Sequence, residues 1–240
     1  MLAIDAGNTR IKWGVHDGRG WVATGAVATA DSARIGDAWS TLPRIHGAIA
    51  SNVAGPDVAR NLAAACDARG AALRVIASQA AQLGVVNGYK DPAQLGSDRW
   101  AALVAAHAAL AGHKLVVNAG TALTVDALAA DGRFPGGIIV PGPALMRRSL
   151  DRGTAGLRHT EGTFGQFPAS TPDAITSGAL QACAGAIGRM ADAMAARGSP
   201  VAHVILSGGA AGEIAPLLPM PHAIHENLVI DGLVLIARAS

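Results

Sequence analysis

Short apolar runs that end at small polar turns recur along the chain, and their spacing predicts strands. Residues 2–15 place an apolar strand before Asp5-Ala6-Gly7, followed by a turn and a second strand in which apolar and polar positions alternate. Residues 115–128 repeat this order around Asn118-Ala119-Gly120. Both segments are typical of β-hairpins whose tight turns carry glycine and threonine.

A second pair of segments repeats the order strand, small polar turn, helix. The first copy covers residues 47–65, and the second covers residues 203–218, with Ser207-Gly208-Gly209 at its turn. Two echoes in the same order predict two related α/β halves, although short apolar runs beside glycine are common and coincidence is the alternative. We expect residues 1–112 to form one half and residues 113–240 the other.

Two longer stretches have apolar residues at helical spacing. One runs from Asp98 to about Ala111, and Ser97 is expected to be its N-cap because a serine hydroxyl can accept an unpaired backbone N–H. The other covers residues 174–196 and is rich in alanine and methionine. Residues 158–172 are rich in glycine, threonine and proline and are expected to form a mobile loop.

Composition narrows the class of protein. Half of the 240 residues are hydrophobic and only 15% are charged, which is enough for a sizeable core. The formal charge of +2 comes without a basic run, so we expect no binding to nucleic acid, which needs clustered cations. Cys66 and Cys183 are expected to be reduced core residues. Because there is neither a signal-peptide pattern nor an apolar run of roughly 20 residues, we expect a cytoplasmic protein without a membrane partner.

The first hairpin carries groups that suit a nucleotide phosphate. Asp5 ends a strand and could hold Mg²⁺ through water, and Lys12 could add a positive charge near the β- or γ-phosphate. Gly7 allows the close backbone approach that phosphate oxygens require. This is not a P-loop, because the pattern GxxxxGK[ST] is absent. The alternative is a plain solvent-exposed turn.

The second hairpin would supply a matching clamp on the opposite side of the phosphates. Thr121 offers a hydroxyl, and Gly120 offers an unobstructed backbone. The turn at Ser207-Gly208-Gly209 could then take the adenosine or its ribose against bare backbone, although many strand-to-helix turns look like this one.

A carboxylate stands beside a guanidinium in Gly96-Ser97-Asp98-Arg99, at the start of the first predicted helix. Asp98 could accept the proton of an attacking hydroxyl, and Arg99 could bind an anionic group through two hydrogen bonds. A weak base is sufficient for phosphoryl transfer, because positioning matters more than early proton removal. The alternative is an aspartate that interacts with the helix dipole beside a surface arginine.

Five motifs follow one another along the chain: Asp5-x-Gly7-Asn8-Thr9, Gly96-x-Asp98-Arg99, Gly120-Thr121-Ala122-x-Thr124, Gly136-Gly137-x-Ile139-x-Pro141-Gly142 and Ser177-Gly178. In this combination and order the chain resembles the type III pantothenate kinases and the related Bvg accessory factor proteins. With the turn that ends at Gly209, the resemblance covers nearly the whole chain.

The resemblance implies the fold of the acetate and sugar kinase, Hsp70 and actin superfamily. This is an α/β fold with two ribonuclease-H-like halves and mixed sheets flanked by helices. It implies ATP-dependent phosphorylation of pantothenate to 4′-phosphopantothenate, the first step of coenzyme A biosynthesis. It also implies Mg²⁺, a monovalent cation (K⁺ or NH₄⁺), and a homodimer with the substrate near the interface.

The same resemblance implies roles for individual residues. The residues implied to bind ATP are Asp5, Ala6, Gly7, Asn8, Thr9, Arg10, Ile11, Lys12 and Thr121. Asp98 is the implied catalytic base. The residues implied to bind pantothenate are Tyr89, Gly96, Ser97, Asp98, Arg99 and Thr171. Where the family generally has an aspartate for the monovalent cation, this chain has Asn118, which offers an amide oxygen without the charge.

Two other functions compete with this interpretation. One is a kinase of the same superfamily that acts on a sugar or a short acid, since one fold hosts many substrates. The other is a non-catalytic accessory or regulatory protein that keeps the nucleotide pocket. A binding module has no need of a base beside its ligand, so Asp98 argues against the second.

Overall fold

In the computed structural model, residues 1–153 and 161–239 are described, and the chain divides into two compact units. The first unit contains Met1–Leu110 together with the C-terminal segment that begins at Asn227. The second unit contains Ala111–Glu226. The sequence-based boundary lay after residue 112 and left the C-terminal segment in the second half, so the structure differs from it at that segment.

Helix α7 (Leu228–Arg238) explains this difference. It packs against helix α3 (Ser97–Ala109) of the first unit, and its apolar residues are buried there. The approach is close at Gly232, where a Cβ atom would lie 1.9 Å from the carbonyl oxygen of Ala101. A helix that follows the second half in sequence therefore completes the core of the first.

A five-stranded sheet forms the centre of the first unit, in the order β3-β2-β1-β4-β5. Strands β1, β2 and β3 form an antiparallel meander, and β4 and β5 add in parallel on the other side of β1. The strands are β1 (Leu2–Ala6), β2 (Arg10–His16), β3 (Trp21–Ala28), β4 (Gly47–Asn52) and β5 (Ala72–Val75).

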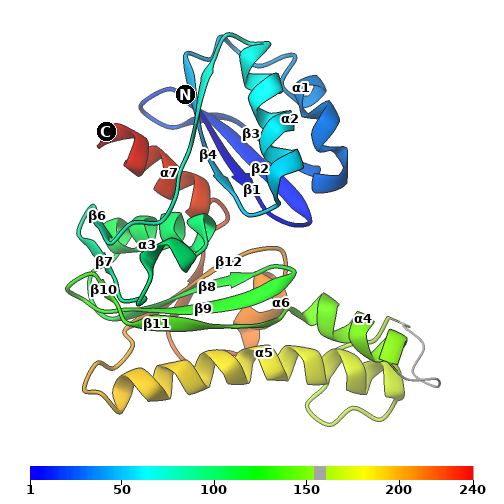
Figure 1. The fold of residues 1–240 in the computed structure, drawn as a ribbon. Coiled ribbons are helices and arrows are strands. Elements are labelled where there is room, and N and C mark those ends of the chain that lie inside the picture. Colours follow the sequence, from blue (N-terminus) through cyan, green and yellow to red (C-terminus); the bar gives the residue numbers. More distant parts are fainter. Residues whose placement is uncertain (154–160, 240) are drawn as a thin grey trace. The chain divides into compact units, whose positions relative to one another are not determined.

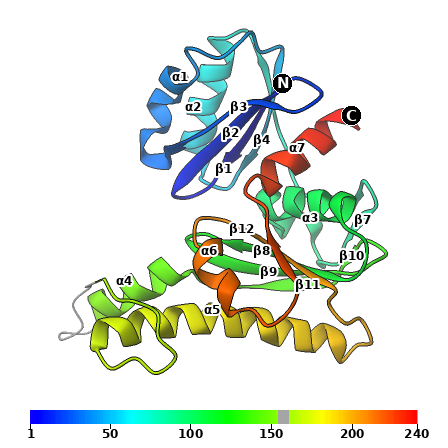
Figure 2. The ribbon, with the colours of Figure 1, turned by 180° about the vertical axis from the view of Figure 1, so that it is seen from behind.

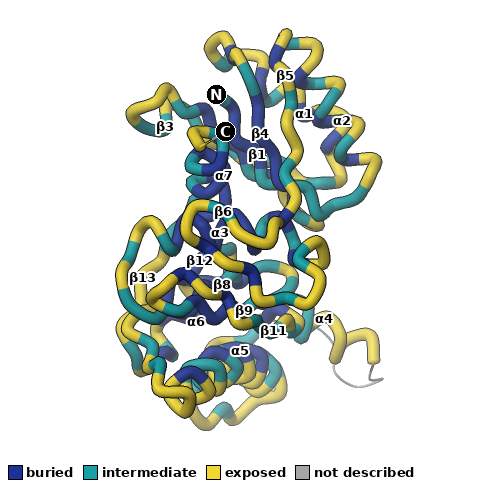
Figure 3. Tube along the Cα trace, turned by 60° about the vertical axis from the view of Figure 1, so that its left-hand side comes forward, coloured by how far each residue is buried: buried dark blue, intermediate teal, exposed yellow. Residues whose placement is uncertain are grey.

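The two faces of this sheet have different covers. Alternate residues of β1, β2 and β4 pack into one core with α2 (Pro56–Asp67) and the short helix α1 (Ile35–Ala38), and the short helix η1 (Thr29–Arg34) packs beside α2. Helix α7 contacts β1, β2 and β4, and α3 contacts β4 (Figure 2). Figure 3 shows β1 and β4 buried along most of their length. Because side chains alternate across a strand, the residues between these core positions point to the opposite face.

The connection from β5 to α3 is compact and carries little regular structure. Its elements are β6 (Ala81–Gln82), β7 (Val85–Asn87) and η2 (Pro92–Gln94). Strands β6 and β7 pair as a hairpin through a turn at Leu83 and Gly84, both of which have positive φ. The indole N–H of Trp100 donates to Oε1 of Gln82 at 3.0 Å and ties this hairpin to α3.

The second unit repeats the strand order and directions of the first sheet. Its order is β11-β9-β8-β12-β13, with β8, β9 and β11 antiparallel and β12 and β13 added in parallel beside β8. The strands are β8 (Lys114–Ala119), β9 (Ala122–Leu128), β11 (Gly136–Pro141), β12 (His203–Ser207) and β13 (His222–Ile224). The two-residue strand β10 (Arg133–Phe134) lies between β9 and β11 in the sequence and is not part of this sheet. The predicted duplication is confirmed.

Helix α5 (Thr171–Ala195) runs along the second sheet (Figure 1) and supplies Leu180, Cys183 and Ile187 to its core. The remaining helices of this unit are α4 (Pro143–Gly153), α6 (Ala211–Ile214) and η3 (Ala215–Leu217). The predicted loop covers residues 158–172, of which residues 158–160 lie outside the described residues. Helix α5 begins at Thr171, so the last two residues of the predicted loop are helical.

Two further expectations can be compared with the structure. Cys66 and Cys183 are both free and buried, one in the core of each unit, as predicted. Among the helices described, none combines the length and the apolar character that crossing a bilayer requires.

Candidate functional site

Asp5, Lys12 and Ser51 lie on one face of the first sheet and form an in-register row across three strands. Asp5 pairs with Lys12 of β2 and with Ser51 of β4. The neighbours of Asp5 in the chain, Ile4 and Ala6, belong to the core on the opposite face. Strand alternation therefore places the carboxylate, the ammonium group and the hydroxyl together, away from that core.

The turn that follows Asp5 is held by backbone hydrogen bonds and by Thr29. The amide of Gly7 donates to the carbonyl oxygen of Arg10 at 3.1 Å and closes the turn. Thr29 holds the turn from outside: its hydroxyl donates to the Gly7 carbonyl oxygen at 2.7 Å, and its amide donates to the Thr9 carbonyl oxygen at 3.0 Å. Asn8, like its neighbours Thr9 and Arg10, is exposed.

Two residues of the predicted ATP-binding segment have their side chains elsewhere. Ala6 and Ile11 are fully buried in the core of the first unit. These two positions can therefore offer only backbone atoms to a ligand, and their side chains stabilise the hairpin instead.

Helix α3 begins next to this row, and its N-terminus differs from the expectation. Gly96 is the N-cap, and no side chain caps the helix, so the prediction of Ser97 as N-cap is wrong. The Ser97 hydroxyl lies 2.8 Å from the Ser51 hydroxyl in a buried hydrogen bond. A partner on β4 therefore engages the group that would otherwise have capped the helix.

Asp98 is the second residue of α3, and its carboxylate folds back over the helix start. Its Oδ1 accepts a hydrogen bond from the amide of Arg99 at 2.8 Å. A Cβ atom on Gly96 would lie 2.5 Å from the same oxygen. Because Gly96 has φ −55° and ψ 136°, which any residue can adopt, the need for glycine here is steric and comes from Asp98.

The carboxylates of Asp5 and Asp98 interact. Burial and the negative charge of Asp98 raise the pKa of Asp5 from 3.8 to about 7, and Lys12 partly offsets this. A bound cation would offset the electrostatic repulsion between these two partly buried carboxylates. The described residues contain no group of three or more His, Cys, Asp and Glu side chains that could hold a metal. One or two carboxylates suit Mg²⁺, which takes its other ligands from water and phosphate.

Arg99 is buried at 6% exposure, so it is not the surface arginine of the alternative interpretation. Its Nη1 donates to the hydroxyl of Tyr89 at 2.9 Å, and its guanidinium carbon lies 5.7 Å from the centre of the Tyr89 ring. Tyr89 and Arg99 therefore form a pair beside the Asp98 carboxylate.

The position of Tyr89 is set by the loop before it. Oδ1 of Asn87 accepts from the Tyr89 amide at 3.1 Å, and Nδ2 of Asn87 donates to the carbonyl oxygens of Gln79 and Pro92. The hydroxyl of Ser78 also contacts the carbonyl oxygen of Pro92, at 2.5 Å. This network orders a segment that has almost no regular secondary structure.

The second unit has a matching row at the same place in its sheet. Asn118 pairs with Thr124 of β9 and with Ser207 of β12, as Asp5 pairs with Lys12 and Ser51. The turn after it is shorter: the amide of Gly120 donates to the carbonyl oxygen of Ala122 at 3.0 Å. Thr121, at the tip, is exposed.

Two glycines, Gly142 and Gly208, lie so close to this second turn that neither position has room for a Cβ atom. A Cβ atom on Gly142 would lie 2.1 Å from the Gly120 carbonyl oxygen, and the Gly142 amide donates to the Thr121 carbonyl oxygen at 2.9 Å. Gly208 has φ +95°, and a Cβ atom there would lie 2.7 Å from Oδ1 of Asn118. The glycine motifs that follow each strand therefore shape the hairpin turn.

The structure thus gathers Asp5, the first turn, Tyr89 and Gly96–Arg99 in the first unit. Asn118, Thr121 and Thr171 belong to the second unit, where Thr171 is the exposed first residue of α5 and follows the N-cap Ser170. Sequence reasoning missed Thr29, Ser51, Asn87 and the contact made by Gly142. The Ser51–Ser97 and Gly142–Gly120 contacts join segments distant in sequence, so no local pattern marks them.

Comparison with known proteins decides the family. A family model described as type III pantothenate kinase matches residues 1–193. The chain belongs to the type III pantothenate kinase family. A relative named type III pantothenate kinase from Aromatoleum aromaticum is 49% identical over 238 residues, which cover 99% of this chain and 98% of the relative.

Solved structures agree on the fold. A protein from Sinorhizobium meliloti described as a 2-dehydro-3-deoxygalactonokinase has TM-score 0.64 at 20% identity, with 99% of this chain and 98% of that chain covered. An inorganic polyphosphate/ATP-glucomannokinase from Arthrobacter has TM-score 0.51 at 17% identity, with 100% and 99% covered. The chain therefore shares the fold of these kinase structures, and its mixed sheets flanked by helices agree with the predicted α/β fold.

Proposed function

We propose that this member of the family transfers the γ-phosphoryl group of ATP to the primary hydroxyl of pantothenate, with Asp98 as the base. The products are 4′-phosphopantothenate and ADP, and the reaction is the first step of coenzyme A biosynthesis. The observation that carries the assignment of Asp98 is its carboxylate, which interacts with Asp5 beside the phosphate-type turn and adjoins buried Arg99.

The acceptor side is built by Tyr89 and the start of α3. Arg99 would bind the pantothenate carboxylate or a nearby polar atom, held in place by its hydrogen bond to the Tyr89 hydroxyl. Asp98 would accept a hydrogen bond from the primary hydroxyl and aim its oxygen at the γ-phosphorus. As the new P–O bond forms, the bond to the β–γ bridging oxygen breaks, ADP leaves, and the hydroxyl proton passes to Asp98.

Residues of both hairpin turns would bind ATP in this proposal. The first would offer backbone amides of Gly7–Thr9 and the ammonium group of Lys12 to phosphate oxygens. From the second unit, Thr121 would contribute its hydroxyl. Fixed donors of this kind stabilise the charge that develops in the transition state without reorganisation of solvent.

Asp5 would hold Mg²⁺, through water or directly, because its partly buried oxygens face a second carboxylate. When bound, the cation neutralises charge on the phosphates and orients them. Asn118 is the position proposed for a monovalent cation, K⁺ or NH₄⁺. Its Oδ1 sits at the turn of Gly208 and offers an uncharged oxygen.

We place the enzyme in the cytoplasm, as a homodimer with the pantothenate site near the interface. Thr171 would contact the substrate there. The dimer and the role of Thr171 follow from the family resemblance, and size-exclusion chromatography with light scattering tests the dimer.

A steady-state assay with ATP and a panel of acceptors tests the function. The panel contains pantothenate, a hexose and a short hydroxy acid, each with Mg²⁺ and with or without K⁺ or NH₄⁺. We expect turnover with pantothenate well above that with the other acceptors. Turnover of another acceptor alone would assign a different kinase activity. ATP binding without any turnover would favour the accessory protein.

A further inference from the structure

Ser51 and Ser97 form a hydrogen bond between two elements that each carry a carboxylate. Their hydroxyl oxygens are 2.8 Å apart, and the two side chains are 0% and 8% exposed. In sequence they are 46 residues apart. Ser51 stands on β4 directly beside Asp5 of β1, and Ser97 immediately precedes Asp98 on α3.

We propose that the Ser51–Ser97 hydrogen bond is a positioning contact that fixes the start of α3, and with it Asp98, relative to Asp5. The inference rests on the proposed function, in which Asp98 aims the acceptor hydroxyl and Asp5 lies on the phosphate side. In this role neither serine hydroxyl acts on the reacting atoms, because the two hydroxyls bond to each other. Each acts through the aspartate beside it.

The geometry of the helix start supports this role. The N-cap residue Gly96 offers no side-chain cap, and within the first turn the short Asp98–Arg99 contact engages a backbone amide. The Ser97 hydroxyl is directed to the sheet instead, and the sheet is the rigid element from which Asp5 projects. The bond therefore adds a long-range link between the two elements that carry the carboxylates.

The duplicated fold provides an internal comparison. Ser207 occupies the position in the second sheet that Ser51 occupies in the first, because each pairs with the polar residue second from the end of the central strand. A small hydroxyl residue at this place is thus a property of both halves. In the first half, this hydroxyl meets the helix that carries the base.

The experiment uses Ser51→Ala, Ser97→Ala and the double variant in the pantothenate assay. We expect each single variant to lower kcat by about tenfold, since a small misplacement of a catalytic group has effects of this size or larger. We expect the KM for ATP to change by less than about twofold. The double variant should lose about as much as either single variant, because both remove the same bond.

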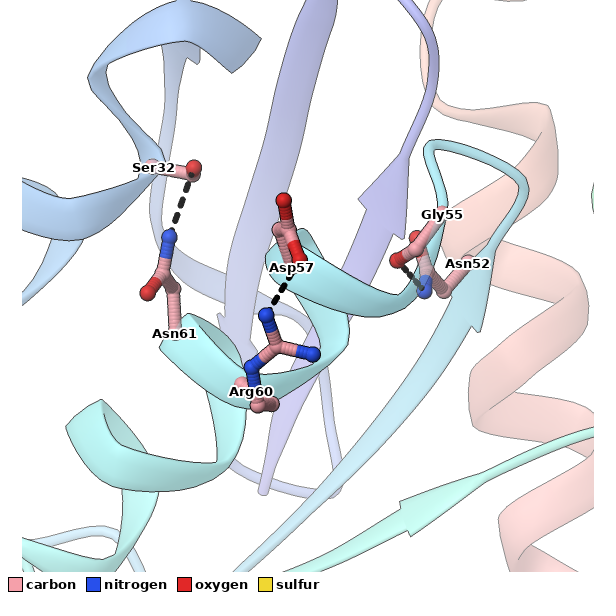
Figure 4. Close-up of polar contacts among 6 residues, drawn as sticks. All are labelled: Ser32, Asn52, Gly55, Asp57, Arg60 and Asn61. Carbon is pink, nitrogen blue, oxygen red and sulfur yellow. Dashed lines mark hydrogen bonds and ion pairs between the residues drawn. The ribbon is translucent and has the colours of Figure 1, made fainter.

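Ser32→Ala is the matched control. Ser32 is a buried serine of the same unit, at 6% exposure, and its hydroxyl accepts a hydrogen bond from Nδ2 of Asn61 at 3.0 Å (Figure 4). The variant loses a partly buried hydroxyl contact, and the partner in this contact lies on α2. We expect kcat to remain within about twofold of wild type, as for a change remote from the reacting groups.

Several results would overturn the inference. Single variants with wild-type kcat, multiplicative losses in the double variant, or a change confined to the KM for pantothenate would each do so. If Ser51→Ala does not fold, Ser51→Cys, whose somewhat larger thiol forms a weaker hydrogen bond, replaces it, with the same expected fall in kcat. A wild-type enzyme that does not turn over pantothenate would contradict the proposed function instead.

Discussion

The carboxylate of Asp98 lies over Gly96, and a Cβ atom on Gly96 would be 2.5 Å from its Oδ1. That separation is too short for non-bonded atoms, so a side chain at this position and the observed place of the carboxylate exclude each other. The backbone of Gly96 tolerates alanine, so the conflict is with Asp98. Glycine in the Gly96-x-Asp98-Arg99 motif thus gives the base its place.

Gly96→Ala should therefore lower kcat by about tenfold or more, because the methyl group displaces the Asp98 carboxylate. Stability should change little. Gly188→Ala on α5 is the control, since a Cβ atom there meets nothing within 4 Å, and it should leave kcat unchanged. Steady-state kinetics of both variants, with thermal unfolding, would show the difference. Equal kcat values would contradict the steric argument.

Tyr89→Phe keeps the aromatic ring near Arg99 and removes the hydroxyl that accepts the hydrogen bond from its Nη1. Because the guanidinium then loses one restraint, we expect the KM for pantothenate to rise by about threefold to tenfold, in line with the loss of one charge-assisted bond. The KM for ATP should hardly change. A larger effect on ATP than on pantothenate would argue against a role in acceptor binding.

The raised pKa of Asp5 predicts that the stability of the metal-free protein depends on pH. Its pKa is about 7 in the folded chain, against 3.8 as the ordinary value. The folded state therefore retains a proton that the unfolded state releases between these values, and the free energy of unfolding falls as pH rises through this window. Above pH 7 Asp5 is ionised in both states, and the full loss of stability from burying its charge remains.

Asp5→Asn should remove this cost, so the variant should gain stability over wild type progressively from about pH 4 to pH 7 and hold that gain at higher pH. Denaturant unfolding with a chelator present, at several pH values, measures it. A stability difference that does not vary with pH would contradict the raised pKa.

Lys114 is fully buried on β8, and its Nζ has no hydrogen-bond partner within the described part of the chain. Burial lowers its pKa from the usual 10.5, so charge at this position destabilises the fold at neutral pH. Lys114→Met should raise the free energy of unfolding by about 1–3 kcal/mol, the cost of an unsatisfied buried polar group.

The sign of this effect with pH can also be checked. Below the folded pKa both states carry the charge and the penalty is complete, and it disappears as the pH rises toward 10.5. The advantage of Lys114→Met should therefore shrink in alkaline buffer. A constant or growing advantage would show that packing, and not charge, causes it.

The sequence predicts the two hairpins and the duplication well, because alternating apolar positions and glycine turns are local signals. It also places Asp98 and Arg99 at a helix start. Prediction from the sequence fails where a residue distant in the chain binds a polar group that local rules assign to another role. Serine is a favoured N-cap residue, yet the hydroxyl of Ser97 forms a hydrogen bond with Ser51 of β4 instead.

Long-range packing also explains the other differences. α7 belongs to the first unit because Gly232 allows it to approach Ala101, a contact that no local pattern marks. Gly142 stands in a motif visible in the sequence, but its reason, the turn at Gly120, lies more than a full strand away. The loop around Tyr89 is ordered by Asn87 and Ser78 through backbone carbonyl groups, which composition does not reveal.

The central claim is that Asp98 receives the proton of the pantothenate hydroxyl, and Asp98→Asn tests it most directly. The variant keeps the shape of the side chain but lacks the base. Single-turnover kinetics with enzyme in excess over ATP and with saturating pantothenate should show a loss of at least about 100-fold in the rate of phosphoryl transfer, with ATP binding by calorimetry nearly unchanged. A rate close to that of wild type would contradict the account.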